Sequence, residues 1–166
     1  YNLAIIYDFG LGIKENKDKA VKWYKKASNL NHKIAQFNLA WMFYNGEKLE
    51  KNNFEAFNYY LRSANQGYNK AQFNLANLYF VGEGTMKDYV ESYKWFKISS
   101  MNGIEDSNKF LVKLSRLMHP EEIKEAENKI EEWLQNKKIK GIERRAKYIM
   151  IHFEDSSLMI HLGMSG

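Results

Sequence analysis

A motif that returns every 36 residues constrains this chain more than any other feature of its sequence. Asn2-Leu3-Ala4 recurs as Asn38-Leu39-Ala40 and as Asn74-Leu75-Ala76, and the six residues Ala35–Ala40 are identical to Ala71–Ala76. Self-similarity at a period of this length is typical of solenoids, in which each unit of two or three elements packs against its neighbours. The sequence therefore predicts a repeat architecture over its first hundred residues.

Each unit is predicted to consist of a helix, a turn and a second helix. Leu39, Ala40 and Phe43 fall on one face of a helix, and the turn residue that follows is glycine in all units: Gly10, Gly46 and Gly82. Glycine readily adopts the left-handed conformation that ends a helix. Short polar residues expected to cap the second helix are Asp18, Asn53 and Asp88. The second helix presents a packing face of Ala56, Tyr59, Tyr60 and Ser63, which one hairpin cannot bury alone.

The recurring residues resemble the Sel1-like repeat family. The first unit shows them as Leu3-Ala4, Tyr7, Gly10, Gly12, Lys19-Ala20, Trp23-Tyr24 and Lys26-Ala27. Two departures are an alanine in place of the usual glycine after the leucine, and Lys48 in place of the second turn glycine. The resemblance covers residues 1–103. It implies a mainly α fold, an α-solenoid of helical hairpins, that serves as a scaffold or adaptor for another protein.

The period fades from Ile104, but the helical pattern continues. Apolar residues keep helical spacing at Phe110, Leu111, Leu114 and Leu117. Pro120 is expected to open another helix, because proline is favoured at the first helical position. Residues 104–135 are therefore predicted to form a helical hairpin that caps the solenoid.

Residues 136–166 have a different character. Residues 146–153 and 158–162 alternate or run apolar around a polar turn, which predicts a β-hairpin. Arg144-Arg145-Ala146-Lys147-Tyr148 and His161-Leu162-Gly163-Met164-Ser165-Gly166 resemble the N-terminal domain of formamidopyrimidine-DNA glycosylase. The resemblance implies a partial β segment of that domain and assigns DNA contacts to Lys147, His161 and Met164, with Met164 filling the space of a flipped base.

The resemblance does not extend to the catalytic parts of the glycosylase family. Its nucleophile is an N-terminal proline amine and its zinc finger uses four cysteines, whereas this sequence has Pro120 as its one proline and no cysteine. We therefore expect no catalytic residues, no cofactor, no metal and no excision of oxidised purines. The rival hypothesis is a fragment or fusion of a base-excision-repair glycosylase. The tail's origin stays open among a gene fusion, a recombination scar and a misassembled reading frame; a true fusion implies the cytoplasm, and the periplasm is the alternative.

The candidate partner site lies on the first helix of each unit, which lines the concave face of helical-hairpin solenoids. The residues proposed for it are Phe37, Trp41, Tyr44, Phe73, Asn77 and Phe80. The alternative is that these aromatics pack against the neighbouring repeat. A protein or peptide is the expected partner, with a weak DNA contact through the basic tail, and no apolar run is long enough to span a membrane.

Overall fold

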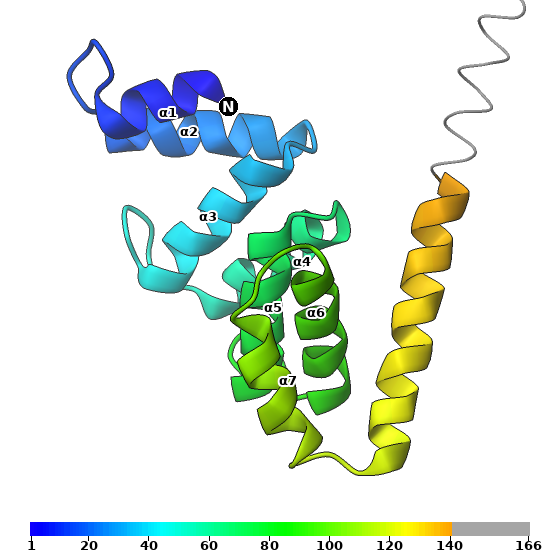
Figure 1. Ribbon diagram of the computed structural model, residues 1–166. Coiled ribbons are helices and arrows are strands. Elements are labelled where there is room, and N and C mark those ends of the chain that lie inside the picture. The colour runs from blue at the N-terminus through cyan, green and yellow to red at the C-terminus, as the bar shows by residue number, and fades with distance from the viewer. Residues whose placement is uncertain (141–166) are drawn as a thin grey trace, which may run out of the picture. The chain divides into compact units, whose positions relative to one another are not determined.

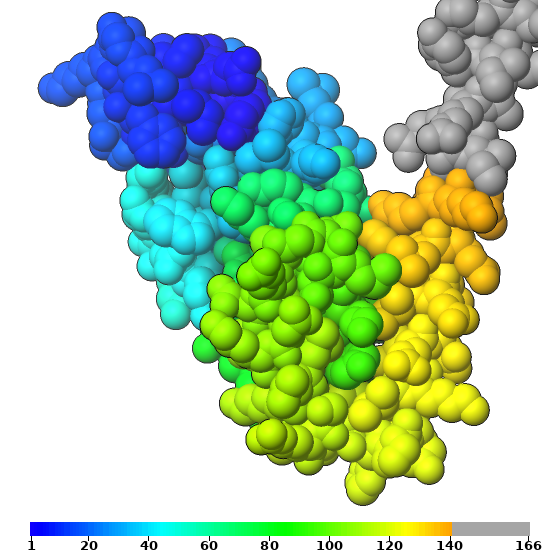
Figure 2. Space-filling view, in the orientation of Figure 1, coloured from blue at the N-terminus to red at the C-terminus, as the bar shows by residue number. Residues whose placement is uncertain are grey.

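The computed structural model describes residues 1–140 and consists of helices joined by short turns (Figure 1). Seven helices carry labels: α1 (Asn2–Phe9), α2 (Lys17–Asn29), α3 (Lys33–Asn45), α4 (Asn53–Asn65), α5 (Asn69–Val81), α6 (Tyr89–Met101) and α7 (Ser107–Ser115). Residues 120–140 are also helical. Two compact units divide the chain, Tyr1–Glu127 and Asn128–Gly166. Within the first unit each labelled helix packs against the next in chain order, and Figure 2 shows consecutive repeats in contact through their side chains.

The ends of the helices follow the 36-residue step. Helices α1, α3 and α5 end at glycines in the left-handed conformation, as predicted: Gly10, Gly46 and Gly82. The predicted caps of the second helices are confirmed for Asp88 but wrong for the other two units. The side chains that accept an amide hydrogen bond at the start of α2 and α4 are Asn16 and Asn52. Asn16, Asn52 and Asp88 follow one another at intervals of 36 residues, whereas Asp18 and Asn53 do not fit this spacing.

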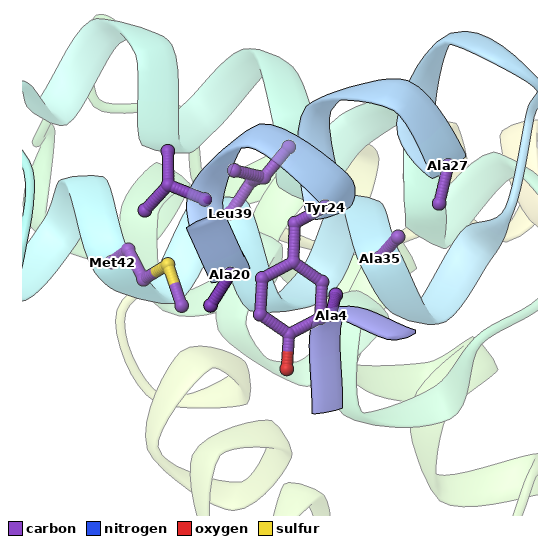
Figure 3. Packing of buried hydrophobic residues seen from close by; sticks show 8 residues of the cluster. Ala4, Ala20, Tyr24, Ala27, Ala35, Leu39 and Met42 are labelled. Atoms are coloured by element: carbon purple, nitrogen blue, oxygen red, sulfur yellow. The ribbon is translucent and has the colours of Figure 1, made fainter. Parts of the chain in front are cut away.

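Small residues let the two helices of each hairpin approach closely. Ala4, Ala40 and Ala76 are fully buried, and so are Leu39 and Leu75 beside them. Figure 3 shows the core of the first junction, where the Tyr24 ring lies among alanines from three helices. The predicted packing face of α4 is confirmed, since Ala56, Tyr60 and Ser63 are buried, and the Tyr59 ring stacks on Phe43 at 5.7 Å.

Polar side chains tie each hairpin to the next. Gln36 is fully buried; its amide donates to the Ser28 carbonyl at 3.3 Å and its oxygen accepts from Gln66 at 2.6 Å. The same two bonds return 36 residues later among Ala64, Gln72 and Asn102. Ser63 and Ser99 likewise donate to the first-turn carbonyls of α3 and α5. Burying these amides is tolerable because each one has a partner.

The fold class is mainly α, a solenoid of helical hairpins. No strand occurs in residues 1–140, and the predicted β-hairpin lies outside the described residues. Pro120 is the first residue of the last helix, as expected, and the Glu122 carboxylate accepts from the His119 amide at 2.7 Å just before it. That helix continues through the basic run of residues 136–140. Over the part of the chain described, no helix is long and apolar enough to cross a membrane.

Candidate functional site

Two hollows lie along the first helices of the repeats. The first, of about 370 Å³, is lined by residues of α1, α2, α3 and the turn after α3, and by Lys70 of α5. The second, of about 390 Å³, is lined by residues of α3, α4, α5 and the turn after α5. The Trp41 side chain lines both hollows, and 42% of it is exposed to solvent. A large aromatic residue therefore stands at a wall that the two cavities share.

The two hollows are the same site repeated. Many lining residues of the first return 36 positions later in the second, as the pairs Asp8 and Tyr44, Phe9 and Asn45, Tyr24 and Tyr60, Asn38 and Asn74, Trp41 and Asn77, Met42 and Leu78, and Glu47 and Glu83. In each hollow a hydrogen bond from the asparagine to the buried tyrosine lowers the tyrosine pKa, but the larger effect of burial raises it. The recurring Asn-Leu-Ala motif thus supplies a polar group to each hollow.

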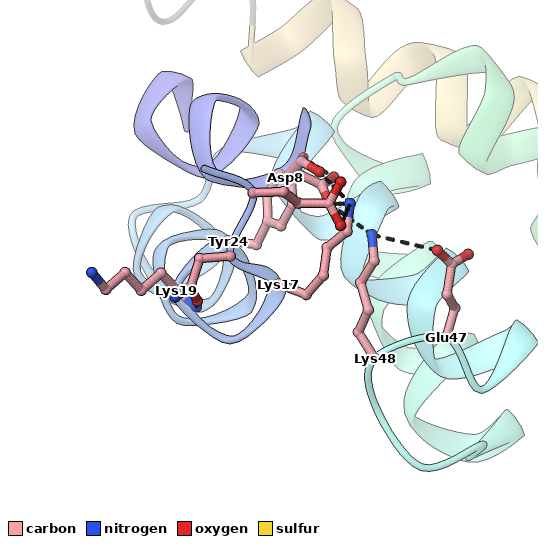
Figure 4. Close-up of polar contacts among 8 residues, drawn as sticks. Asp8, Lys17, Lys19, Tyr24, Glu47 and Lys48 are labelled. Carbon is pink, nitrogen blue, oxygen red and sulfur yellow. Dashed lines mark hydrogen bonds and ion pairs between the residues drawn. The ribbon is translucent and has the colours of Figure 1, made fainter. Parts of the chain in front are cut away.

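The first hollow contains a buried carboxylate that the chain neutralises itself. Asp8 is 6% exposed. Its carboxylate accepts from the Lys48 ammonium at 2.6 Å and from the Tyr24 hydroxyl at 3.0 Å, and Lys17 lies 3.4 Å away (Figure 4). Burial raises the pKa of Asp8, but the hydrogen bonds from Lys48 and Tyr24 together with the Lys48 charge outweigh it, so the pKa lies below its ordinary value.

Lys48 reaches Asp8 from an unusual backbone position. Its φ is 68°, in the left-handed region that favours glycine, and the equivalent residues of the other units are Gly12 and Gly84 with φ of 75° and 71°. Lys48, which departs from the repeat pattern, therefore has a strained backbone conformation. Its ammonium group connects the second repeat to Asp8 of the first. The Lys48 ammonium also lies 3.5 Å from the Glu47 carboxylate.

The second hollow has the same framework but different charges. Glu83 is the charged residue among its lining side chains. One oxygen of its carboxylate, Oε2, is buried without a hydrogen-bond partner. Burial raises the pKa of Tyr44, and a hydrogen bond to Glu83 and the charge of Glu83 raise it further. Gly84, which has no side chain to contribute, stands in the place of Lys48.

The structure separates the six predicted partner residues into two groups. Trp41, Tyr44 and Asn77 line the second hollow, and Phe37 lines the first. Phe73 and Phe80 line neither of these hollows. Both rings contact Phe110 of α7, which also stacks on Phe96 at 4.5 Å. Phe110 lies 36 residues after Asn74. At the junction of the third repeat with α7, an aromatic ring therefore occupies the place that Asn38 and Asn74 have in the two hollows.

Sequence reasoning missed the charged residues of both hollows. The sequence pattern identifies Gly82 as a turn residue but assigns no role to Glu83 after it, and it marks Lys48 only as a departure from a family pattern. Asp8 has no counterpart acid in the other units, since the equivalent residues are Tyr44 and Phe80. The signal that could have found them is the break in the repeat itself: a lysine at a glycine position is best explained by a specific contact.

Other predicted residues fall elsewhere. Lys147, His161 and Met164 lie outside the described residues. His32 Nδ1 accepts a hydrogen bond from the Ala35 amide at 3.2 Å and so caps the start of α3. Within residues 1–140, no group of three or more histidine or carboxylate side chains is placed to hold a metal ion.

The repeats match a known family and known structures. The family model described as Sel1 repeat matches residues 1–32, 33–68 and 69–104. A Sel1 repeat protein from Oxalobacter formigenes is similar over 66% of this chain and 45% of its own, with 32% identity and a TM-score of 0.64. A protective antigen of uropathogenic Escherichia coli that displays an SLR fold is similar over 81% of this chain and 29% of its own, with 29% identity and a TM-score of 0.72. Helicobacter pylori cysteine rich protein B is similar over 58% of this chain and 72% of its own, with 25% identity and a TM-score of 0.56.

The C-terminal part matches a second family. The model described as formamidopyrimidine-DNA glycosylase N-terminal domain matches residues 106–166. The formamidopyrimidine-DNA glycosylase of Ruthia magnifica is 67% identical over 33 residues, which are 20% of this chain and 12% of the relative. That of Marinobacter nauticus is 54% identical over 35 residues, 21% of this chain and 13% of the relative. This part of the chain is thus similar to a fragment of that domain, and the match spans about an eighth of these relatives.

Proposed function

Because the chain belongs to the Sel1 repeat family, we propose that its repeats bind an extended segment of another protein along the first helices. The observation that carries the proposal is the pair of equivalent hollows with the exposed Trp41 ring at their shared wall. A cavity that recurs once per repeat suits a partner whose side chains also recur along a line. Aromatic anchors seated beside pockets contribute most of the affinity in protein interfaces.

The predicted partner residues support this site to different degrees. Trp41, Tyr44 and Asn77 line the second hollow and Phe37 lines the first, so these four form the contact surface that we propose. Phe73 and Phe80 pack around Phe110, and we propose that they fix the position of α5 against α7. In that role they hold the second hollow's far wall in place.

The test uses dodecapeptides selected from a random library on the whole protein. Replacing Trp41 with Ala should weaken their binding by about 2 kcal/mol, roughly 30-fold, if the ring is a central anchor. The matched control is Phe54→Ala, because Phe54 is also an exposed aromatic, 63% accessible, and lines neither hollow.

Far-UV circular dichroism checks that both variants remain folded. Equal affinities of the Trp41 variant and the wild type would contradict the proposed groove. So would a Trp41 variant that unfolds while the remaining folded protein binds as before, because Trp41 would then be part of the core.

For the C-terminal tail, residues 136–166, we propose a β-hairpin that makes weak contact with DNA phosphates. Support comes from the identity of the glycosylase relatives over this part of the chain, and the motif resemblance assigns the contacts to Lys147, His161 and Met164. Counterion release makes such binding fall steeply with salt. We expect a duplex to bind in about 50 mM salt and to dissociate near 200 mM, and Lys147→Ala to weaken it. Binding that does not depend on salt or on Lys147 would contradict this proposal.

A further inference from the structure

The second hollow contains a negative charge without a positive one. Its lining includes Glu83 and no lysine or arginine, and Oε2 of Glu83 is buried with no hydrogen-bond partner. A buried carboxylate oxygen without a partner is unfavourable, because a desolvated charge loses the hydrogen bonds of water. A hydrogen-bond donor or a cation placed beside Oε2 of Glu83 would therefore be stabilising.

Two of the three asparagines that line this hollow have each used one amide hydrogen. The Asn45 amide donates to the Trp41 carbonyl at 2.9 Å, and the Asn77 amide donates to the Phe73 carbonyl at 3.1 Å. Each of these two side chains keeps its oxygen as an acceptor and one amide hydrogen as a donor. The lining also includes the Trp41 and Tyr44 rings, whose faces attract cations; the Lys51 ammonium lies 5.6 Å from the centre of the Tyr44 ring.

The first hollow shows how the same framework accommodates a cation. There the Lys48 ammonium sits 2.6 Å from Asp8 and 3.5 Å from Glu47, and Glu47 is the equivalent of Glu83. The equivalent position of the next repeat cannot supply this cation to the second hollow. Gly84 occupies the place of Lys48, and a Cβ built on it would lie 2.0 Å from the carbonyl oxygen of Asn53, so any side chain would force the backbone to shift.

We propose that the second hollow receives an arginine or lysine side chain of the bound segment, with its charged group on Glu83 and its alkyl stem against the Trp41 ring. This inference rests on the proposed function, because it names the chemistry of the partner at that same site. Lys48 in the first hollow is the chain's own version of this contact. The bound segment is thus expected to carry one basic residue at the position that meets the junction between the second and third repeats.

The experiment uses pools of dodecapeptides with one fixed central residue and random neighbours. The central residue is arginine, lysine, citrulline, norleucine or glutamate, and citrulline keeps the shape of arginine without its charge. The whole protein should bind the arginine pool about tenfold or more tightly than the citrulline pool, since hydrogen bonds to charged groups are the strong ones. Glu83→Gln should abolish this preference.

Glu50→Gln is the matched control, because Glu50 is exposed in the turn after α3 and lines neither hollow; its preference should equal that of the wild type. Equal binding of the arginine and citrulline pools, still sensitive to Trp41→Ala, would overturn the cation site and leave the groove standing. A preference for the glutamate pool would also overturn it. If Trp41→Ala weakens the binding of none of the pools, the groove itself is refuted.

Discussion

Replacing Lys48 tests whether a buried ion pair holds the first two repeats together. The Lys48 and Asp8 side chains are 13% and 8% exposed and 2.6 Å apart. Removing one partner of a buried pair costs about 3–5 kcal/mol. Because Tyr24 and Lys17 still contact Asp8, we expect Lys48→Met to lose about 3 kcal/mol, at the lower end of that range.

Lys48→Gly separates the ion pair from the backbone strain. Both variants lose the ammonium, but glycine relieves a left-handed conformation that is unfavourable by about 1–2 kcal/mol for other residues. The glycine variant should therefore be more stable than the methionine variant. In the double variant Asp8→Asn with Lys48→Met, the loss should be smaller than in Lys48→Met alone, because an asparagine leaves no buried charge unpaired.

The assay is native-state hydrogen exchange, read helix by helix. In a solenoid, stability is approximately a sum of terms for each repeat and each junction. A loss of about 3 kcal/mol at the first junction should raise exchange in α1 and α2 on the order of 100-fold, with little change in α5 and α6. The control is Lys109→Met. Its ion pair with Asp106 joins side chains that are 82% and 69% exposed, so the substitution should leave exchange unchanged. An Lys48→Met variant that exchanges like the wild type would refute the reasoning, and so would an equal rise in every helix.

Three further predictions follow from single contacts. Because the pKa of Asp8 is lowered in the folded chain, its contribution to stability is present above the ordinary aspartate pKa of about 3.9 and is lost as pH falls through the folded value; urea melts against pH should show this loss in the wild type and not in Asp8→Asn. Phe110→Ala removes a ring stacked on α6 at 4.5 Å and should lower the free energy of unfolding by about 3 kcal/mol, measured by the same melts. Gly84→Ala should destabilise the chain far more than Gly12→Ala, because both have positive φ but the new Cβ has open space at Gly12 and meets the Asn53 backbone at Gly84; equal thermal shifts would contradict this.

The hairpins could be predicted from sequence because their signals are local. Gly10, Gly46 and Gly82 end their helices through their own backbone conformations, and the alanines beside them mark the packing face. The capping residues were harder, since Asn52 and Asn53 are adjacent and chemically alike, so composition alone does not choose between them. Applying the 36-residue step backward from Asp88 does choose, and it selects Asn52.

The site could be predicted only in part, because the surroundings of its predicted residues depend on residues that are distant in the sequence. Phe73 looks like Phe37 in the repeat, but its environment is set by Phe110, which lies where the period has faded. Glu83 looks like a turn residue until Trp41 and Tyr44 are placed beside it. A pattern within one helix identifies candidate contacts, whereas the neighbour that covers or exposes them comes from another repeat.

The repeated hydrogen bonds of the buried glutamines bear on how such a chain can change length during evolution. Gln36 and Gln72 bind the preceding hairpin through equivalent carbonyls, and both lie in the same hexapeptide. Recombination between the two copies would delete or duplicate one 36-residue unit, and the glutamine at the new junction would find a carbonyl at the expected place. The shortened chain would, however, set Asp8 opposite Gly84 in place of Lys48. The equivalent glutamine hydrogen bonds therefore allow the chain to gain or lose whole units. The Asp8–Lys48 ion pair, which lies between the first two repeats, opposes such a change there.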